Sequence, residues 1–265
     1  MKKRSLIPLI VIFNLSTAYA QYNEIEFIGN VKSVTINEKT FDISYTTIQF
    51  REFDTLGRLI KIFHHDKYYD DKYLTLYRYN ISGKLEGYNM YRGDSESSPI
   101  MFESQYVYEN GRIAKEKFKG YVRDKGILKE VQEHENIFKY DQRGLLLEGT
   151  YIECGPGYFT YDSLGRLIES DGYEHSERLV YKGDHVYQMI IEYGDEEVFT
   201  YNDDGRLALY ERYSDGLERR DGHEPIQRYS YRYLADSSGN WTHLYCKNLK
   251  TGEERLVIER IFEYR

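Results

Sequence analysis

Apolar and polar positions alternate with a period of two along most of the chain. The alternation is cleanest in residues 228–233, where tyrosine occupies every second position. Residues 186–193 alternate in the same way, and the apolar positions of residues 256–264 share one face except at Arg260. This period is typical of β-strands with two different faces. It predicts an all-β chain in which residues 127–138 form one long strand, and no segment has helical periodicity.

Short turns separate these strands, and most of them follow one motif. The motif reads aromatic, acid or amide, two variable positions, glycine, base and aliphatic, and its most complete copy is YDSLGRLI at residues 161–168. Eight copies can be recognised, some of them degenerate, and the tightest spacing is the 20 residues between Tyr161, Tyr181 and Tyr201. The positions that we assign to the repeat turns are Asp54, Gly57, Gly83, Gly111, Asp141, Gly144, Tyr161, Asp162, Gly165, Arg166, Tyr201, Gly205 and Gly239.

The residue types of the motif are those that a β-hairpin turn requires. An Asp or Asn side chain accepts a hydrogen bond from the backbone two residues on. Glycine provides the positive φ of a type I turn followed by a G1 bulge. Two strands of about seven residues with two short turns fill a spacing of about 20 residues. Each copy therefore predicts one hairpin.

The number of hairpins limits the shape of the sheet. Roughly sixteen to eighteen strands spaced by ~4.8 Å would form a ribbon ~80 Å wide. Open sheets seldom exceed about 10 strands without curling. We therefore expect a single antiparallel, strongly coiled or rolled sheet of consecutive β-hairpins.

The beginning of the chain has the pattern of a secretory signal peptide. Lys2, Lys3 and Arg4 precede a mostly apolar run, and Ala18-Tyr19-Ala20 is an A-x-A cleavage site. Residues 1–20 are predicted to be removed on export. Residues 21–265 are then one domain with N-terminal cap strands (21–52), repeats (53–241) and C-terminal strands (242–265), because no linker or change in composition divides them.

The motif resembles the YD repeat of the RHS (rearrangement hotspot) family. The resemblance covers about residues 53–241 and is best in the copies that begin at Phe53 and Tyr161. The opening GNVKSV (29–34) and the closing DSSGNWT (236–242) are also similar to the ends of short YD-repeat proteins exported by Gram-negative bacteria. The resemblance implies a continuous sheet of hairpins that winds into a spiral or shell. Long members enclose a toxic domain, but here the repeats are too few for a large shell and no such domain follows them.

Composition narrows the choice of partners. Removal of Lys2, Lys3 and Arg4 lowers the net charge from −8 to −11, which argues against nucleic acid as a partner. No later apolar run has the length of a membrane-spanning helix, so we expect no membrane insertion. The chain has 29 tyrosines, which suit half-buried strand positions and also stacking against a ligand. The candidate binding aromatics are Tyr68, Tyr69, Tyr229, Tyr231 and Tyr233.

No sequence signature of an enzyme, metal site or cofactor site is present. The chain lacks a G-x-S-x-G elbow, a P-loop, a dinucleotide fingerprint and the common zinc or calcium spacings. His64 and His65 are adjacent on a strand and point to opposite faces. Cys154 and Cys246 are about eight strands apart, and a disulfide requires Cα atoms within about 7 Å. They can pair only if the sheet curls back on itself, so free thiols are favoured.

These observations favour a non-enzymatic exported scaffold without a cofactor. We expect it to bind a partner protein or a glycan at the cell envelope, whether periplasmic, outer-surface or secreted. Two alternatives remain open at this point. One is a component of a contact-dependent toxin or immunity system, which rests on the resemblance alone. The other is a glycan or cell-wall hydrolase whose paired carboxylates the sequence does not locate.

Overall fold

The structure is a computed structural model, and it describes residue 27 and residues 29–39, 46–124, 127–151, 155–172, 176–191, 195–213 and 224–265. Every regular element in these ranges is a β-strand. Within them, no helix has the length and apolarity of a membrane span. The predicted signal peptide and Cys154 lie outside these ranges.

The strands follow one another in an antiparallel meander. They are β1 (Val31–Lys39), β2 (Thr46–Phe53), β3 (Leu59–Asp66), β4 (Asp71–Tyr79), β5 (Leu85–Arg92), β6 (Ile100–Glu109), β7 (Arg112–Asp124), β8 (Ile127–Tyr140), β9 (Leu146–Tyr151), β10 (Gly155–Tyr161), β11 (Leu167–Asp171), β12 (Ser176–Lys182), β13 (His185–Ile191), β14 (Glu196–Tyr201), β15 (Leu207–Tyr213), β16 (Gln227–Ala235), β17 (Trp241–Asn248) and β18 (Glu254–Tyr264). The all-β antiparallel prediction is confirmed, and β8 is the long strand predicted from residues 127–138.

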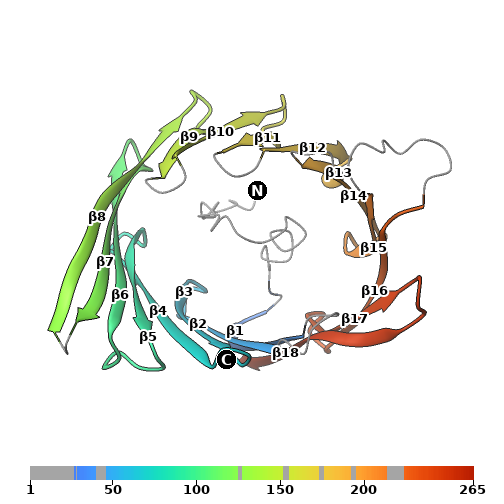
Figure 1. Cartoon of the computed structure of the whole chain (residues 1–265), viewed down its shortest axis with the longest axis horizontal. Coiled ribbons are helices and arrows are strands. Elements are labelled where there is room, and N and C mark those ends of the chain that lie inside the picture. The colour runs from blue at the N-terminus through green and yellow to red at the C-terminus, as the bar shows by residue number, and fades with distance from the viewer. Residues whose placement is uncertain are drawn as a thin grey trace.

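The 18-stranded sheet closes on itself. Strand β1 pairs with β2 on one side and with β18 on the other, β18 pairs with β17 and β1, and each remaining strand pairs with its two chain neighbours. The result is a closed β-barrel, seen as a ring in Figure 1. The expectation of a coiled or rolled sheet, with too few repeats to close a shell, is corrected accordingly. Closure satisfies the backbone groups of both end strands, which a rolled sheet would leave unpaired.

Closure also contradicts the prediction of no membrane insertion. That prediction rested on the lack of an apolar run of helical length, a criterion that does not apply to strands. A closed barrel pairs the backbone groups of all its strands within the ring, and it is the β architecture that can span a bilayer.

All eight repeat turns lie at one rim of the barrel. In a meander, alternate turns fall at opposite rims, and the motifs occupy the turns that follow the even-numbered strands β2 to β16. We call this end the motif rim and the opposite end the variable rim, because the turns there share no motif. At the motif rim, the Asp162 carboxylate accepts hydrogen bonds from the Leu164 and Arg166 amides at 2.9 Å and from Arg166 Nε at 2.6 Å. Gly165 has a φ of 82°.

The motif also connects each hairpin to the next one. The Arg58 guanidinium lies 4.6 Å from the centre of the Tyr79 ring, which belongs to the following motif. The Tyr79 hydroxyl donates a 2.8 Å hydrogen bond to the Leu59 carbonyl oxygen, directly after Arg58. The same stacking of a base or imidazole on the next hairpin's aromatic ring recurs in Lys84–Tyr108, Arg112–Tyr140, Arg166–Tyr181, His185–Tyr201 and Arg206–Tyr233. A chain of cation–π or ring contacts therefore runs along the motif rim.

A ninth turn at this rim is assembled from two distant parts of the chain. Tyr264 pairs with Val31 as Phe53 pairs with Leu59 in the first motif, and Gly29 has a φ of 88°. The Arg265 amide donates to the Asn30 carbonyl oxygen at 2.9 Å, which is the bond that Asp162 makes to Arg166 in the intact copy. Residues 29–31 and 264–265 thus form a split motif at the seam between β1 and β18.

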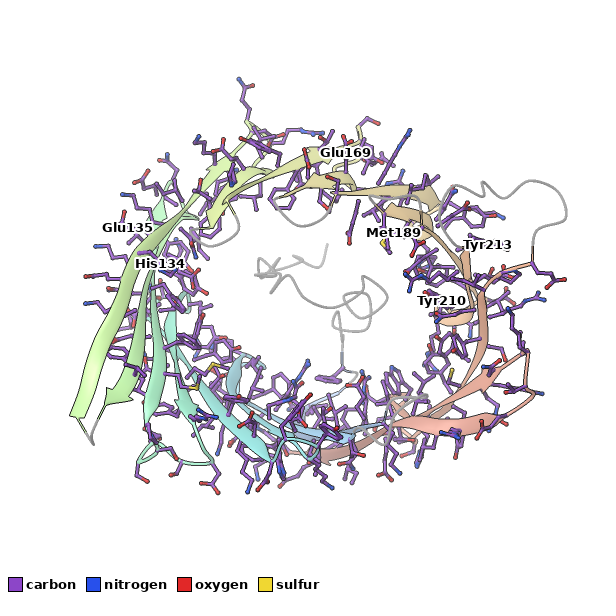
Figure 2. All side chains as sticks on the ribbon, in the orientation of Figure 1. His134, Glu135, Glu169, Met189, Tyr210 and Tyr213 are labelled. Atoms are coloured by element: carbon purple, nitrogen blue, oxygen red, sulfur yellow. The ribbon has the colours of Figure 1, made fainter. Side chains whose placement is uncertain are left out.

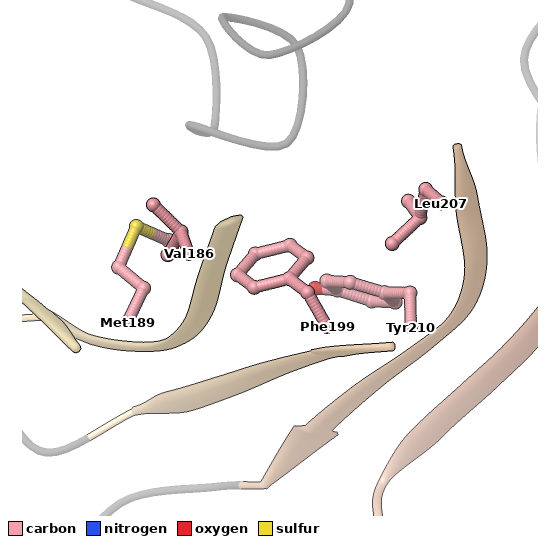
Figure 3. Packing of buried hydrophobic residues seen from close by; sticks show 5 residues of the cluster. All are labelled: Val186, Met189, Phe199, Leu207 and Tyr210. Atoms are coloured by element: carbon pink, nitrogen blue, oxygen red, sulfur yellow. The ribbon is translucent and has the colours of Figure 1, made fainter. Parts of the chain in front are cut away.

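Side chains on the two faces of the wall differ in character. Figure 2 shows His134, Met189 and Tyr210 on the inner side of the ring, and Glu135 and Tyr213 on the outer side. Residues that are partners across the ladder share a face, so the register extends this assignment to the other strands. The largest apolar cluster consists of Val186, Met189, Phe199, Leu207 and Tyr210 (Figure 3). This cluster lines the inner face, and other buried core residues, such as Leu74 and Val198, lie on the outer face.

Replacement of Gly165 by valine should destabilise the barrel by about 1–3 kcal/mol, the usual cost of a non-glycine residue at positive φ. A Cβ at this position would meet only Leu145 methyl groups at 3.6 and 3.8 Å, so backbone strain dominates the cost. Gly165→Asn is the control, because asparagine tolerates this conformation better. Urea unfolding measures both variants. Equal stability of Gly165→Val and the wild type would contradict the assigned turn.

Replacement of Arg265 by alanine should loosen the seam. The Arg265 guanidinium donates to the carbonyl oxygens of Val31 and Phe53 and so joins β18 to β1 and β2. We expect a loss of about 1–2 kcal/mol and faster amide exchange in β1 and β18. Arg255→Ala is the control, since the ion pair of Arg255 with Glu253 is local and exposed. Exchange that rises equally in all strands would argue against a special role of the seam.

Candidate functional site on the inner wall

The predicted binding aromatics separate into two groups. Tyr229, Tyr231 and Tyr233 lie on the inner face of β16, because Tyr229 pairs with the inward-facing Tyr210. Tyr68 and Tyr69 lie in the β3–β4 turn at the variable rim, exposed and in edge-to-face contact at 4.7 Å. The structure does not bring the two groups together. The candidate site is therefore the inner wall, to which only the β16 tyrosines belong.

One arc of the inner wall, on β14 to β16, contains a buried carboxylate. Glu197 is 2% exposed, and the Tyr210 hydroxyl donates a 2.9 Å hydrogen bond to its Oε1. Glu197 Oε2 has no hydrogen-bond partner. Burial raises the pKa of Glu197, against the opposing effect of the Tyr210 hydrogen bond and of Arg212. Tyr210 lies between the rings of Phe199 at 5.8 Å and Tyr229 at 6.3 Å.

A second buried carboxylate lies on β7 and is fully hydrogen-bonded. Glu116 is 3% exposed; its Oε1 accepts from the Ser104 hydroxyl at 2.6 Å and its Oε2 from the Asn136 amide at 2.9 Å. Burial first, and then the nearby Glu116, raise the pKa values of Tyr88 and Tyr106. These tyrosines stay neutral and serve as hydrogen-bonding groups within an aromatic wall.

The two carboxylates belong to opposite arcs of the ring. In Figure 2, His134, which is on the same arc as Glu116, faces Tyr210 across the barrel. The described side chains extend inward from the wall and do not meet across the ring. Each arc thus presents its own aromatic surface with a buried acid. Sequence reasoning missed both acids; the available signal was the placement of Glu197 two residues before Phe199 on the same face of β14.

The outer face changes character around the barrel. On β2 to β5 it has an apolar row, Ile48, Phe50, Phe63, Leu74 and Tyr91, joined by their ladder partners. The same face of these strands also carries Glu52, Lys61, His65 and Lys72. On β7 and β8 the outer face carries lysines and glutamates in ion pairs at 3.2 to 4.0 Å. Lipid-facing strands of transmembrane barrels carry an apolar band. Only part of the outer face of β2 to β5 has this character, and the outer face of β7 and β8 does not.

Other candidate chemistry is dispersed over the wall. Among the described residues, no three or more His, Cys, Asp or Glu side chains are grouped closely enough to hold a metal ion. His64 lies on the inner face of β3, and His65 on the outer face contacts Asp70 at 2.8 Å. Cys246 is buried on the inner face of β17 opposite Tyr231, whereas Cys154 is outside the described residues.

Geometry thus defines the class of the protein as a closed, 18-stranded antiparallel β-barrel with an aromatic inner face. No family model matches the chain, and no curated protein matches it. Among solved structures, it is similar to a porin-like protein from Bacteroides uniformis, with 10% identity, a TM-score of 0.44 and coverage of 89% of this chain and 99% of that chain. A porin-like protein from Bacteroides vulgatus has 13% identity, a TM-score of 0.37 and coverage of 89% and 98%.

A third similar structure is TcdB2-TccC3 without its hypervariable C-terminal region. It has 12% identity and a TM-score of 0.34, and the match covers 80% of this chain and 15% of that one. The YD/RHS resemblance accordingly stays a resemblance of the turn motif. The closed fold is established by the strand pairing of this chain itself.

Glu197 should make stability depend on pH in a defined direction. Its pKa is raised in the folded protein, so the unfolded chain releases this proton at lower pH than the folded one. The resulting stability is present below the ordinary pKa of glutamate, about 4.3, and is lost as pH rises through the folded value. Glu197→Gln should remove this part of the profile and be as stable as the wild type or more stable at pH 8.

Tyr210→Phe provides the matched test of the same pair. Loss of the hydroxyl removes a hydrogen bond that lowers the pKa of Glu197. The decrease in stability should therefore continue to higher pH than in the wild type. Urea unfolding between pH 4 and 9 measures both variants. A wild-type profile that coincides with that of Glu197→Gln would contradict the raised pKa.

Proposed function

We propose that the chain is an exported, non-enzymatic β-barrel of the cell envelope that holds a partner protein or glycan against its inner wall. The proposed location rests on the basic start, apolar run and A-x-A site of residues 1–20. The finer kinship with short YD-repeat proteins of the RHS type is part of the same proposal and rests on the eight turn motifs.

The tyrosines on the inner face of β16 support a protein or a glycan as the ligand. Tyr229 and Tyr231 partly remain accessible on the inner wall, and Tyr210 stacks on Tyr229. Tyrosine combines a large apolar ring with a polar hydroxyl and has few rotatable bonds, so it binds chains and sugar rings at low entropic cost. A ring-shaped wall also surrounds an extended ligand from several sides, which adds contact area.

The two alternatives have less support. A hydrolase needs two carboxylates about 5–10 Å apart across one bond, whereas Glu197 and Glu116 lie on opposite arcs. Asp195, which is near Glu197, is paired with Arg212. A role in a contact-dependent toxin or immunity system rests on the turn motif, which is part of the fold and has no chemical role.

The binding proposal can be tested with an inner and an outer tyrosine. The purified protein is incubated with envelope extract and with a glycan array to identify what it binds. The affinity of Tyr231→Leu for that ligand is then compared with the affinity of Tyr158→Leu. Tyr158 is exposed on the outer face of β10, next to Glu148 and Asp171. We expect the inner variant to lower affinity by about tenfold or more, the effect of losing an aromatic anchor, and the outer variant to keep it.

Stability has to be matched before affinities are compared. Tyr231 packs against the main apolar cluster, so Tyr233→Leu serves as a second inner variant if Tyr231→Leu unfolds. Equal binding by inner and outer variants of similar melting temperature would contradict an inner-wall site. Failure to capture any ligand from either source would remove the support for a binding scaffold.

A further inference from the structure

Strands β7 and β8 form a hairpin that projects beyond the ring at the variable rim. They are the longest strands of the barrel, and in Figure 1 they run side by side to a common end at the lower left, outside the ring. Pairing of β6 with β7 ends at Phe102↔Gly120, whereas β7 and β8 stay paired as far as Asp124↔Ile127. The β7–β8 hairpin therefore extends past the end of the ladder between β6 and β7.

The projecting part of β8 has a free edge. Within the described residues, β8 pairs with β9 only from Ile137↔Thr150 to Tyr140↔Leu146. Residues 127–136 pair with β7 on one side and have no described strand on the side of β9. An unpaired strand edge carries a row of N–H and C=O groups that can accept a further strand.

Side chains next to this edge also have unused polar atoms. His134 stacks on Phe118 at 4.6 Å on the inner face, and its Nδ1 is buried without a hydrogen-bond partner. Asn136 Oδ1 is likewise buried without a partner, although its amide nitrogen bonds Glu116. Buried polar atoms in folded proteins are nearly always paired. Both residues lie in the part of β8 that has no described strand on the side of β9.

The charged side chains on the outer face of β8 indicate the charge of a strand that would bind at this edge. Glu133 and Glu135 point outward and are 58% and 42% exposed, with their partners Lys119, Lys115 and Lys117 all on β7. On the side of β9 these glutamates would face the outward side chains of an added strand. Opposite charges directly across a ladder are stabilising, and like charges are destabilising. This favours a basic strand and disfavours β8 of a second copy.

We infer that the free edge of β8 binds an extended polypeptide segment by strand addition, with lysine or arginine on its outer face and hydrogen-bond donors such as threonine on its inner face. The hairpin is thus a docking arm at the variable rim, distinct from the β14 to β16 arc of the inner wall. Binding at this edge does not depend on the ligand that we propose for the inner wall.

A peptide of alternating lysine and threonine, about ten residues long, tests this inference. Fluorescence polarisation measures its binding to the purified protein, and amide hydrogen exchange of residues 133–136 reports strand formation. We expect binding together with slower exchange of these amides. The same peptide with N-methylated amides keeps its charges but cannot form the ladder, and it should bind at least about tenfold more weakly.

A charge swap gives the matched protein variant. Lys119→Glu combined with Glu133→Lys keeps an ion pair between β7 and β8 and reverses the charge presented at the edge. It should weaken binding of the lysine peptide by about 2- to 5-fold and strengthen binding of the corresponding glutamate peptide to the same extent. Wild-type stability of the swap variant in urea confirms that the hairpin is intact.

Three results would overturn the inference. The first is equal affinity for the methylated and unmethylated peptides, which would mean that charge alone drives binding. The second is slow exchange, in the free protein, of those amides of residues 133–136 that point away from β7, which would mean that another part of the chain already covers the edge. The third is a dimer in solution that is lost in Glu133→Pro, which would assign the edge to a second copy.

Discussion

The barrel depends on the contact between the base of one repeat turn and the aromatic ring of the next. Arg58 on Tyr79 and Arg166 on Tyr181 are each worth about 0.5–1 kcal/mol at sites of this exposure. Their importance lies in repetition, because every contact joins neighbouring hairpins at the same rim and fixes the angle between them. The tyrosine hydroxyl strengthens the joint where it bonds the carbonyl oxygen beyond the base, as Tyr79 does at Leu59.

The turn motif was sufficient to predict the antiparallel hairpins, the number of strands and the absence of helices, because glycine at positive φ and an acidic cap have local physical causes. It was not sufficient to predict closure. The ninth turn is divided between Gly29 and Asn30 near one end and Tyr264 and Arg265 near the other. A search for contiguous motifs cannot detect it, and an open sheet was the natural expectation. Both halves can be read in the sequence, as Gly-Asn-Val at residues 29–31 and as Tyr264, but they come together only in the closed barrel.

The candidate site was predictable to a smaller extent. Alternation shows that Tyr229, Tyr231 and Tyr233 share a face, but only a closed ring decides that this face is the inner one. Tyr68 and Tyr69 gave the same compositional signal and lie exposed at the variable rim instead. For Glu197 the sequence offered only its position two residues before Phe199 on the same strand face. Its burial results from the packing of Phe199 and Tyr210 around it, which is a tertiary effect.

The division between the two rims separates the requirements of folding from those of binding. At the motif rim the acid, the glycine, the base and the aromatic residue of the motif take part in turns or stacks, so substitutions at these positions act on stability first. At the variable rim the turns are free to differ in length, and β7 and β8 use this freedom to extend past the ring. The extension has a physical cost, since residues 127–136 of β8 have no neighbouring strand on the side of β9 among the described residues. A polypeptide strand added there would complete the ladder of backbone hydrogen bonds on that side, which gives a physical reason for a partner to bind.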